Sequence, residues 1–283
     1  MPEKWLIYPG QSKTIDVDAI TSLKVSLIGG QVDVIGHDEP TARVEVHNVT
    51  GKDLKVTVEG GRLEIDHPQL RWDNFVDVFR SWQGKAGADV SVLVPRDVAL
   101  KLGTVGGNAL VSGLMRGARL STVGGDLTAD TLVGDIELNS VSGEISVQNH
   151  LGAVKANTVS GDVTLSGTLS RVAVDGVSGN VFVDVQGVPD AIRHNTVSGD
   201  LTLRLDGHVA ARYRINSVSG TLQVDNSIFR GAAARNFEYQ DGELDGHWID
   251  VAANSVSGNV SVVRRATPAP ASAPSSAPTP SNA

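Results

Sequence analysis

Asn157-Thr158-Val159-Ser160-Gly161-Asp162-Val163-Thr164-Leu165 is the clearest copy of a nine-residue phrase that recurs through this chain of 283 residues. The last glycine keeps its place in every copy, and these glycines are Gly107, Gly125, Gly143, Gly161, Gly179, Gly199, Gly220 and Gly258. The first four intervals between them are 18 residues each, for example 179 − 161. Because a unit of this length cannot bury its own apolar face, neighbouring copies must stack and share a core. The sequence therefore predicts a solenoid.

Within each copy, apolar residues recur at every second position in short runs, as Val163 and Leu165 do. This spacing is typical of strands, because alternate side chains share one face, and the Gly, Ser, Asn and Asp between the runs favour turns. We predict an all-β fold, a parallel β-helix or β-solenoid with about 18 residues per rung, in which like side chains stack about 4.8 Å apart. The glycine of each phrase is expected at a corner with positive φ, which glycine adopts at little steric cost.

The core of this solenoid is expected to contain columns of like apolar residues. One column contains the valine of each phrase: Val123, Val141, Val159 and Val177. A second column contains the leucine that lies between the two apolar runs of a copy: Leu132, Leu151 and Leu169.

The composition divides the chain into three parts. Residues 1–97 are an N-terminal β region with a divergent repeat, a hairpin and an aromatic insertion over 70–83, and residues 98–263 are the regular β-solenoid. Residues 264–283 are rich in Pro, Ala and Ser, a composition that cannot offset the entropy of ordering, so we predict a disordered tail.

Three further features refine this division. Ser26–Val34 is the divergent copy of the phrase, so the array could begin there, and Lys55–Ile65 has the alternation of a hairpin around Gly60-Gly61. The last glycine intervals lengthen to 20, 21 and 38 residues, and the third predicts an insertion over 225–254, either an excursion or a degenerate rung. We expect consecutive copies to lie one on top of another throughout.

Aromatic residues make up only 4% of the chain and gather in the two irregular segments, which makes them the candidate interaction surface. They are Trp72, Phe75, Phe79 and Trp82 in the first segment, and Phe229, Phe237, Tyr239 and Trp248 in the second. The first four have helical spacing, which predicts a short amphipathic helix. We favour a capping role for this helix over partner binding, because a solenoid must cover its open ends; both groups could be end caps.

Charge and composition exclude several classes of function. The formal net charge of −8 opposes sequence-independent binding to nucleic acid, and the absence of cysteine excludes thiol nucleophiles, thiolate metal sites and disulfides. No apolar run is long enough to span a membrane. No export signal is visible at the amino terminus, so we expect a cytoplasmic protein.

The polar columns of the repeat are candidates for binding but have a simpler structural role. The Asn and Ser of each phrase can hydrogen-bond from rung to rung. The residue after the glycine is acidic in four copies, Asp126, Glu144, Asp162 and Asp200, so these carboxylates either point into water or hold a cation such as calcium. Asp241–Gly246 matches half of an EF-hand loop, but Ala252 stands where a bidentate Glu is required. We favour solvated carboxylates in both places and predict no metal or cofactor.

No catalytic motif is present, because the seven histidines are scattered and no nucleophile elbow or phosphate-binding loop occurs. His194 falls in an apolar column and is interpreted as a tolerated edge position. Glu243, Asp245, His247 and Asp250 are the only acid–base residues dense enough for a glycan-cleaving site.

The Thr-Val-Ser-Gly-Asp-Val phrases, Gly29–Val34, Trp5–Ile7 and Leu63–Pro68 together resemble the bacterial β-strand-repeat domains of unknown function that are often labelled "putative adhesins". The resemblance implies a β-helical solenoid and no established enzymatic activity. It transfers no catalytic or metal-binding residues, and it implies that related proteins can be associated with the cell surface.

We therefore expect a non-enzymatic β-solenoid that serves as a scaffold or protein-interaction module, with an unknown protein partner or self-association. A glycan-binding or glycan-cleaving β-helix and an exported adhesin-like surface protein are the alternatives.

Overall fold

The computed structural model describes residues 2–68, 86–207, 209–230 and 236–265, and this part of the chain is all-β, with no helix. Its strands are β1 (Glu3–Ile7), β2 (Lys13–Val17), β3 (Ser22–Leu27), β4 (Gly30–His37), β5 (Ala42–Thr50), β6 (Leu54–Glu59), β7 (Arg62–Asp66), β8 (Gly87–Pro95), β9 (Ala99–Thr104), β10 (Asn108–Ser112), β11 (Ala118–Thr122), β12 (Leu127–Asp130), β13 (Ile136–Ser140), β14 (Ile145–Ser160), β15 (Val163–Ser178), β16 (Val181–Val185), β17 (Ala191–Ser198), β18 (Leu201–Leu205), β19 (Ala211–Ser217), β20 (Thr221–Val224), β21 (Ser227–Arg230), β22 (Phe237–Asp241), β23 (Ile249–Ser257) and β24 (Val260–Arg264). The aromatic insertion expected over 70–83 and the tail from 266 lie outside the described residues.

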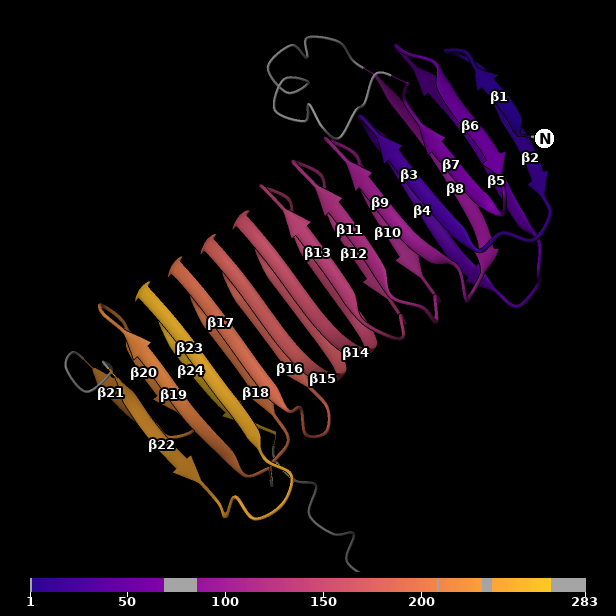
Figure 1. The fold of residues 1–283 in the computed structure, drawn as a ribbon. Coiled ribbons are helices and arrows are strands. Elements are labelled where there is room, and N and C mark those ends of the chain that lie inside the picture. The colour runs from indigo at the N-terminus through magenta and orange to yellow at the C-terminus, as the bar shows by residue number, and fades with distance from the viewer. Residues whose placement is uncertain (1, 69–85, 208, 231–235, 266–283) are drawn as a thin grey trace, which may run out of the picture.

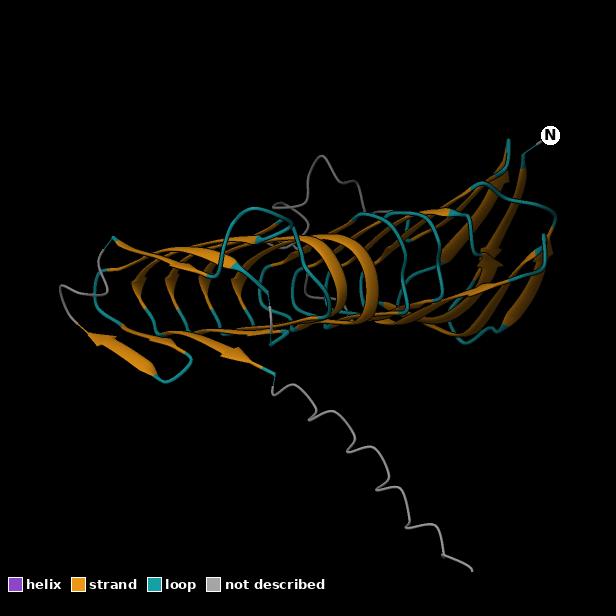
Figure 2. Cartoon of the chain, turned by 90° about the horizontal axis from the view of Figure 1, so that it is seen from below, coloured by secondary structure: helices purple, strands orange, loops and turns teal. Residues whose placement is uncertain are grey.

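The strands form two rows that face each other across a solenoid-like body (Figures 1 and 2). The first row has the order β1-β6-β7-β3-β9-β11-β13-β14-β15-β17-β23-β19-β22. The second row has the order β2-β5-β8-β4-β10-β12-β14-β15-β16-β18-β24-β20-β21. The long strands β14 and β15 run through both rows.

In the central part of both rows the pairing is parallel. Ala109 pairs with Leu127, and Leu127 with Ile145, so each partner lies 18 residues further along the chain. In the first row Leu120 pairs with Leu138 at the same interval. Equivalent residues of successive repeats therefore stand side by side, as the glycine intervals indicated.

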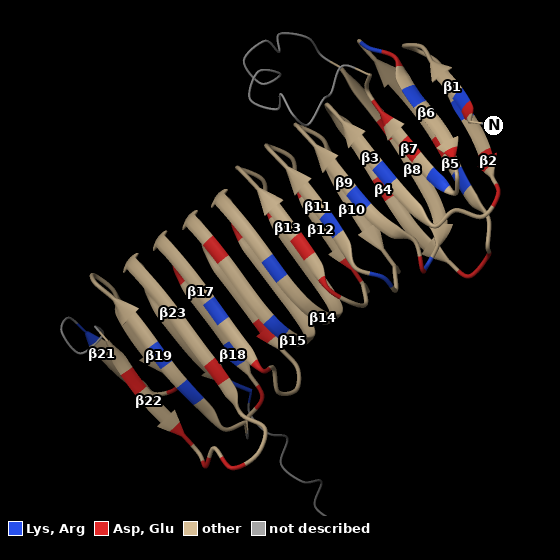
Figure 3. Cartoon of the chain, viewed as in Figure 1, with Lys and Arg blue, Asp and Glu red and all other residues tan. Residues whose placement is uncertain are grey.

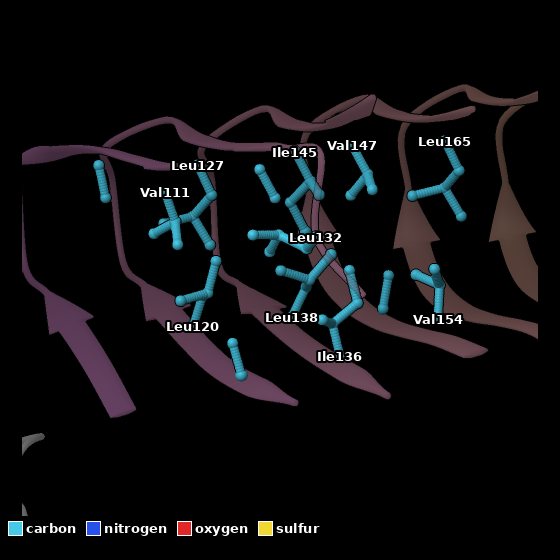
Figure 4. Packing of buried hydrophobic residues seen from close by; sticks show 14 of the residues in the cluster. Val111, Leu120, Leu127, Leu132, Ile136, Leu138, Ile145, Val147, Val154 and Leu165 are labelled. Atoms are coloured by element: carbon cyan, nitrogen blue, oxygen red, sulfur yellow. The ribbon is translucent and has the colours of Figure 1, made fainter. Parts of the chain in front are cut away.

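The apolar core lies between the two rows. Leu120 and Leu138 of the first row and Leu127 and Val147 of the second are at most 1% exposed, and their side chains point toward one another (Figure 4). Residues of both rows remove each of these side chains from water, and this burial stabilises the fold by about 1.5–3 kcal/mol per side chain. The stacked rungs share this core, because no single pair of strands could enclose it.

The first rung of the array is β3 and β4, which lie between later strands. Val32 of β4 pairs with Ala109, 77 residues further on (109 − 32), and on its other side with Val90 of β8. The strands β6 and β7 pair antiparallel around Gly60 and Gly61, whose φ angles are 57° and 76°. The strands β7 and β8, which follow the divergent copy in the sequence, thus pair with its strands β3 and β4 on the side away from the regular repeats.

The expectation that consecutive copies lie one on top of another is wrong at the C-terminal end. The rung β19/β20 does not pair with β17/β18, which precedes it; instead β23 pairs with β17 on one side and with β19 on the other. Likewise β24 lies between β18 and β20. The last rung of the sequence is therefore inserted inside the stack (Figure 1).

Antiparallel strands close both ends. At one end β1 and β2 pair antiparallel with β6 and β5, and at the other β22 and β21 pair antiparallel with β19 and β20. The expected insertion over 225–254 contains β21 and β22, so it forms this end and then returns to the inserted rung. Trp5 and Val58 pack on the core near the first end, and Phe229 and Phe237 near the second.

The corner glycines are required mainly because the rungs approach closely. A Cβ on Gly143 would lie 1.8 Å from the carbonyl oxygen of Gly125, and one on Gly258 would lie 2.0 Å from that of Gly199. Positive φ, which we expected at every corner, occurs at Gly161, Gly179 and Gly199. The expectation is wrong at the other five corners, where the neighbouring backbone is what excludes a side chain.

Candidate functional site

The valines of the phrase form an exposed row along one edge of the solenoid. Val141, Val159, Val177, Val197 and Val256 are 42%, 49%, 49%, 51% and 52% exposed, and we call these five residues the valine ridge. Val218, in the rung beyond Val256, is 45% exposed and extends the row. Their rungs are adjacent in the order 141, 159, 177, 197 and 256, as the pairing of β13, β14, β15, β17 and β23 shows. The expectation that Val141, Val159 and Val177 belong to the core is therefore wrong.

For Val141, Val159 and Val256 the reason lies in the preceding residue, because Ser140, Thr158 and Ser255 are 5%, 7% and 7% exposed. At Thr122 and Ser140 the hydroxyl oxygens accept hydrogen bonds of 3.0 and 2.9 Å from the backbone N–H groups of Gly125 and Gly143. Burying these hydroxyls satisfies backbone groups at the corner that would otherwise lose a partner. Because side chains alternate along a strand, the next residue must point outward.

The same column is buried near the N-terminal end. Ile28, Val105 and Val123 are 2%, 6% and 8% exposed and form a small apolar cluster with Ala86. The column therefore changes along the solenoid from covered to exposed between Val123 and Val141.

A ladder of amides runs beside the valine ridge on the outer face of the first row. The Nδ2 atom of Asn157 donates to Oδ1 of Asn139 at 2.8 Å, that of Asn195 donates to Oδ1 of Asp175 at 2.7 Å, and that of Asn254 donates to Oδ1 of Asn195 at 2.9 Å. These bonds confirm the expected rung-to-rung role of the asparagines. Between ladder and ridge lies a hollow of about 300 Å³, lined by residues of three rungs: Ser121, Thr122, Asn139, Ser140, Val141, Asn157, Thr158 and Val159.

The acidic column after the corner glycines is also a ladder. Oδ1 of Asp126 accepts a 3.0 Å bond from the amide N of Glu144, Oδ1 of Asp162 one of 2.7 Å from that of Asn180, and Oδ1 of Asp200 one of 2.8 Å from that of Asn259. In the described part of the chain, no group of three or more His, Asp and Glu side chains could hold a metal ion. These carboxylates serve the backbone of the next rung, a role that the sequence interpretation missed.

One of the three carboxylates in the acidic loop over Asp241–Gly246 forms an ion pair. Asp241 forms an ion pair with Arg264 at the end of β24, whereas Glu243 and Asp245 are exposed. Arg264 also donates a 3.3 Å hydrogen bond to the hydroxyl of Tyr213. The first carboxylate of the loop thus ties β22 to the inserted rung.

The aromatic residues proposed as an interaction surface divide into three groups. Trp72, Phe75, Phe79 and Trp82 lie outside the described residues. Phe229 and Phe237 are partly buried against the core with ring centroids 4.6 Å apart, so they join the two end strands β21 and β22. Tyr239 is 45% exposed and stacks on Tyr213 at 6.3 Å, and Trp248 lies beneath the guanidinium of Arg212 at 4.7 Å.

Three histidines are buried in the body. His67, His150 and His194 are 0%, 1% and 2% exposed. Burial lowers the pKa of His67 to about 4, and it also lowers the pKa values of His150 and His194, because the charged form loses its hydration. The interpretation of His194 as an edge position is wrong: its ring takes an inward place beside Val174 and Ala253.

An irregularity in β14 places His150 inside. The pairing of β14 with β15 shifts between Val147 and His150, and Leu151, which we expected in the core, is 51% exposed. A register shift exchanges the faces on which side chains lie.

Two of the residues considered for glycan cleavage are engaged by other side chains. The carboxylate of Asp250 pairs with Arg212 at 3.2 Å and with Arg214 at 2.6 Å, and the His247 ring bonds to Asp190 at 3.1 Å.

Comparison with known proteins agrees with this architecture. Residues 20–264 match the family described as Toastrack DUF4097. The chain belongs to this family. Toastrack domains are β-helical and have no known function, as the resemblance in the sequence implied. No curated protein matches the chain.

Three crystal structures match most of the chain at low sequence identity. A "putative cell adhesion protein" from Clostridium sporogenes ATCC 15579 is 15% identical, with a TM-score of 0.31 over 91% of this chain and 100% of that one. A "putative lipid binding protein" from Parabacteroides distasonis ATCC 8503 is 13% identical, with a TM-score of 0.44 over 91% and 98%. A "putative adhesin" from Bacteroides fragilis NCTC 9343 is 8% identical, with a TM-score of 0.47 over 90% and 98%. None of these names denotes an enzyme. Over the described residues, the chain also has no helix long and apolar enough to cross a membrane.

Proposed function

We propose that this protein is a non-enzymatic scaffold, built as a parallel β-helix with about 18 residues per rung, that self-associates through the valine ridge. The ridge is the observation that carries the proposal. Five valines in adjacent rungs are about half exposed, and polar residues border them on one side. A contiguous apolar patch of a few hundred Å² has the size of the largest patch on a typical monomer, and such patches often have a function.

The groups available for acid–base chemistry support a non-catalytic role. Asp250 is neutralised by two arginines, and the carboxylates of the acidic column accept backbone hydrogen bonds. His67, His150 and His194 are enclosed in the body of the fold. A general acid or base must come within hydrogen-bond distance of a substrate, and the three buried histidines are held away from one.

A second copy of the chain is the partner that fits the ridge best. The valines recur once per rung, at the spacing of about 4.8 Å between paired strands, and a copy related by a two-fold axis presents the same repeat at the same spacing. The neighbouring ladder consists mostly of uncharged asparagine amides, and its carboxylate, Asp175, accepts a hydrogen bond from Asn195, so this border adds little repulsion between two copies of net charge −8. Near Val123 the same column already packs against an apolar residue of this chain, Ala86.

The size of the ridge implies weak association. Five half-exposed valines present at most a few hundred Å², whereas a stable interface buries about 800 Å² on each partner. We therefore expect a dimer that dissociates on dilution.

Sedimentation velocity over a range of protein concentrations tests this proposal. V159T/V177T keeps the β-branched shape of both side chains but adds hydroxyls to the ridge, and we expect it to raise the dimer dissociation constant about tenfold, or by 1.4 kcal/mol. The matched control is I35T/V263T, which alters two other side chains, each 41% exposed, away from the ridge; it should behave as the wild type. A wild-type protein that stays monomeric at every concentration contradicts the proposal.

Engineered cysteines provide an independent test, because the native chain has none. V177C lies at the centre of the ridge and should form a disulfide-linked dimer under mild oxidation, whereas I35C should not. Equal cross-linking of both variants would indicate random collision and not a specific interface.

The exported adhesin-like alternative makes a different prediction about location. Cell fractionation that finds the native protein in the cytoplasm supports the scaffold, and recovery from the cell surface supports the adhesin-like protein.

A further inference from the structure

A shallow trough runs along the outer face of the first row of strands, across β9, β11, β13, β14 and β15. Its volume is about 460 Å³. Small and apolar residues form most of its surface, among them Gly117, Ala118, Ala153 and Ala173. The trough is elongated because its lining comes from paired positions of successive rungs, and Ala173 is the smallest member of the column that also contains Arg119, Glu137 and Lys155.

Charged side chains stand along the trough in strand register. Arg119 pairs with Lys101 on one side and with Glu137 on the other, and Glu137 pairs with Lys155. Beyond Lys155 the sequence of partners continues with Ala173 and then Arg193. Figure 3 shows the resulting line of basic residues over β9, β11, β14 and β17, interrupted by acidic ones.

Several of these cations lack a carboxylate partner. Arg119 forms an ion pair of 2.6 Å with Glu137, and Arg171 lies 3.9 Å from Asp190, at the limit of such a contact. Within the described residues, Lys101, Lys155 and Arg193 form no ion pair, although the chain carries eight more negative charges than positive ones. The outer face of this row therefore has unneutralised positive charge in an otherwise acidic protein, which raises the local concentration of anions.

Three cations surround one small residue at the end of the trough. Lys155 and Arg193 flank Ala173 on the two neighbouring strands, so their backbones are two strand spacings apart, about 10 Å. Arg171 precedes Ala173 by two residues on the same strand and so lies on the same face. The methyl group of Ala173 leaves open space between three long basic side chains, which is the arrangement expected of an anion subsite.

We propose that the trough binds a linear acidic polysaccharide, with a sulfate or carboxylate group held by Lys155, Arg171 and Arg193. An elongated groove of shallow depth suits a polymer that lies along the solenoid axis. The apolar floor can contact the carbon faces of sugar rings, and the carboxylates of Asp135 and Glu137 on the rim can accept hydrogen bonds from sugar hydroxyls.

The lining of the trough argues against a single-stranded nucleic acid. No aromatic side chain lines the trough to stack on bases, which is the usual source of affinity for single strands. This site lies on the sheet face and not on the valine ridge, so it does not depend on the proposed self-association.

Isothermal titration calorimetry with a size-defined heparin octasaccharide tests the site on the full-length protein. We expect K155S/R171S to weaken binding at least about tenfold at low ionic strength, because the variant loses two charge-assisted hydrogen bonds to the anionic group. K4S/K13S is the matched control: it removes two exposed lysines that form no ion pair in the described part, changes the net charge equally, and should bind as the wild type does. The conservative variant K155R/R171K should keep most of the affinity, and thermal melting checks that all variants fold.

Further titrations identify the class of ligand. Neutral dextran oligosaccharides should not bind, and hyaluronan oligosaccharides, which carry carboxylates alone, should bind more weakly than heparin. The proposal is overturned if the wild type does not bind heparin, if both double serine variants lose equal affinity, or if single-stranded DNA binds more tightly than every saccharide. Sedimentation of K155S/R171S should show the wild-type dimer, so failure here is separable from failure of the ridge.

Discussion

The backbone amide of Asn259 donates a 2.8 Å hydrogen bond to Oδ1 of Asp200, which lies 59 residues earlier in the chain. On its other side, the Oδ1 atom of Asn259 accepts a 3.0 Å bond from the amide of Thr221. The corner of the last rung is thus held between two rungs that follow each other in the sequence. The inserted rung β23/β24 therefore contributes backbone hydrogen bonds to both neighbours, whereas a terminal rung would contribute to one.

Gly258 should tolerate no side chain. A Cβ at this position would lie 2.0 Å from the carbonyl oxygen of Gly199, so Gly258→Ala must push two rungs apart. We expect a loss of at least about 2 kcal/mol in the free energy of unfolding, measured by urea denaturation. Gly246→Ala is the matched control, since nothing lies within 4 Å of its added Cβ. Equal effects of the two substitutions would show that the inserted rung is not tightly stacked.

Asp184 should stabilise the end of the inserted rung. It is 9% exposed and forms ion pairs with Arg204 and Arg265. The hydrogen bond with Arg204 lowers the pKa of Asp184. Asp184→Asn leaves Arg204 without a charged partner and Arg265 with Asp206 alone, so we expect a loss of about 1–3 kcal/mol.

Asp16→Asn is the comparison for this ion-pair prediction. Asp16 pairs with Arg43 at 2.7 Å, but its side chain is 69% exposed, and exposed pairs contribute at most about 1 kcal/mol. Chemical denaturation at neutral pH should rank the two variants in this order, and a larger effect at Asp16 would contradict it.

The stability of the protein should fall below pH 6.5, in part because of His67. Burial lowers the pKa of His67 from 6.5 to about 4, so the unfolded chain takes up a proton in this range before the folded chain does. The contribution of the neutral, buried His67 to the free energy of unfolding is fully present above pH 6.5. It falls by about 3 kcal/mol between pH 6.5 and pH 4 for a pKa shift of this size. His67→Gln keeps an acceptor for the amide of Ile28, which bonds to Nδ1 of His67 at 3.3 Å. Its unfolding free energy should fall less between pH 6.5 and 4 than that of the wild type.

Calcium should not stabilise the acidic column. Each carboxylate of the column that bonds to the next rung already has a backbone partner, as Asp126 has in Glu144. We expect the melting temperature to be the same in millimolar calcium chloride and in EDTA, and Asp126→Ala to cost about 1 kcal/mol in either. A melting temperature that rises with calcium would instead indicate a bound ion, because a ligand of the folded state stabilises it by mass action.

The periodic part of the fold could be predicted because each rung repeats the same local chemistry. The 18-residue glycine interval determined which residues pair across β11, β13 and β14, and alternation of apolar residues such as Leu120 and Leu138 located the core. The order of the last three rungs could not be predicted. Copies of one phrase have the same pairing chemistry, so nothing in Gly199, Gly220 or Gly258 shows which of them are neighbours.

The valine ridge was missed because apolar character was used without the strict alternation. Ser140 and Thr158 occupy the inward positions, and their burial at 5% and 7% requires Val141 and Val159 to face solvent. The signal that could have located the ridge is a Ser or Thr three residues before the corner glycine and two residues after a core position, as Ser140 is after Leu138. The trough was missed since its charged residues belong to different rungs and gather only when the strands pair. The cytoplasmic location and the lack of catalytic activity stay predictions.

The inserted rung also constrains the order of events during synthesis. A ribosome releases residues 211–224 before residues 249–264, yet the later segment occupies the place next to residues 191–205. If the earlier segment docked there as soon as it emerged, it would have to detach before the native arrangement could form. A nascent chain halted after residue 241 therefore lacks the rung that pairs with β17 and β18. This end of the fold can be completed only after residues 249–264 have been synthesised.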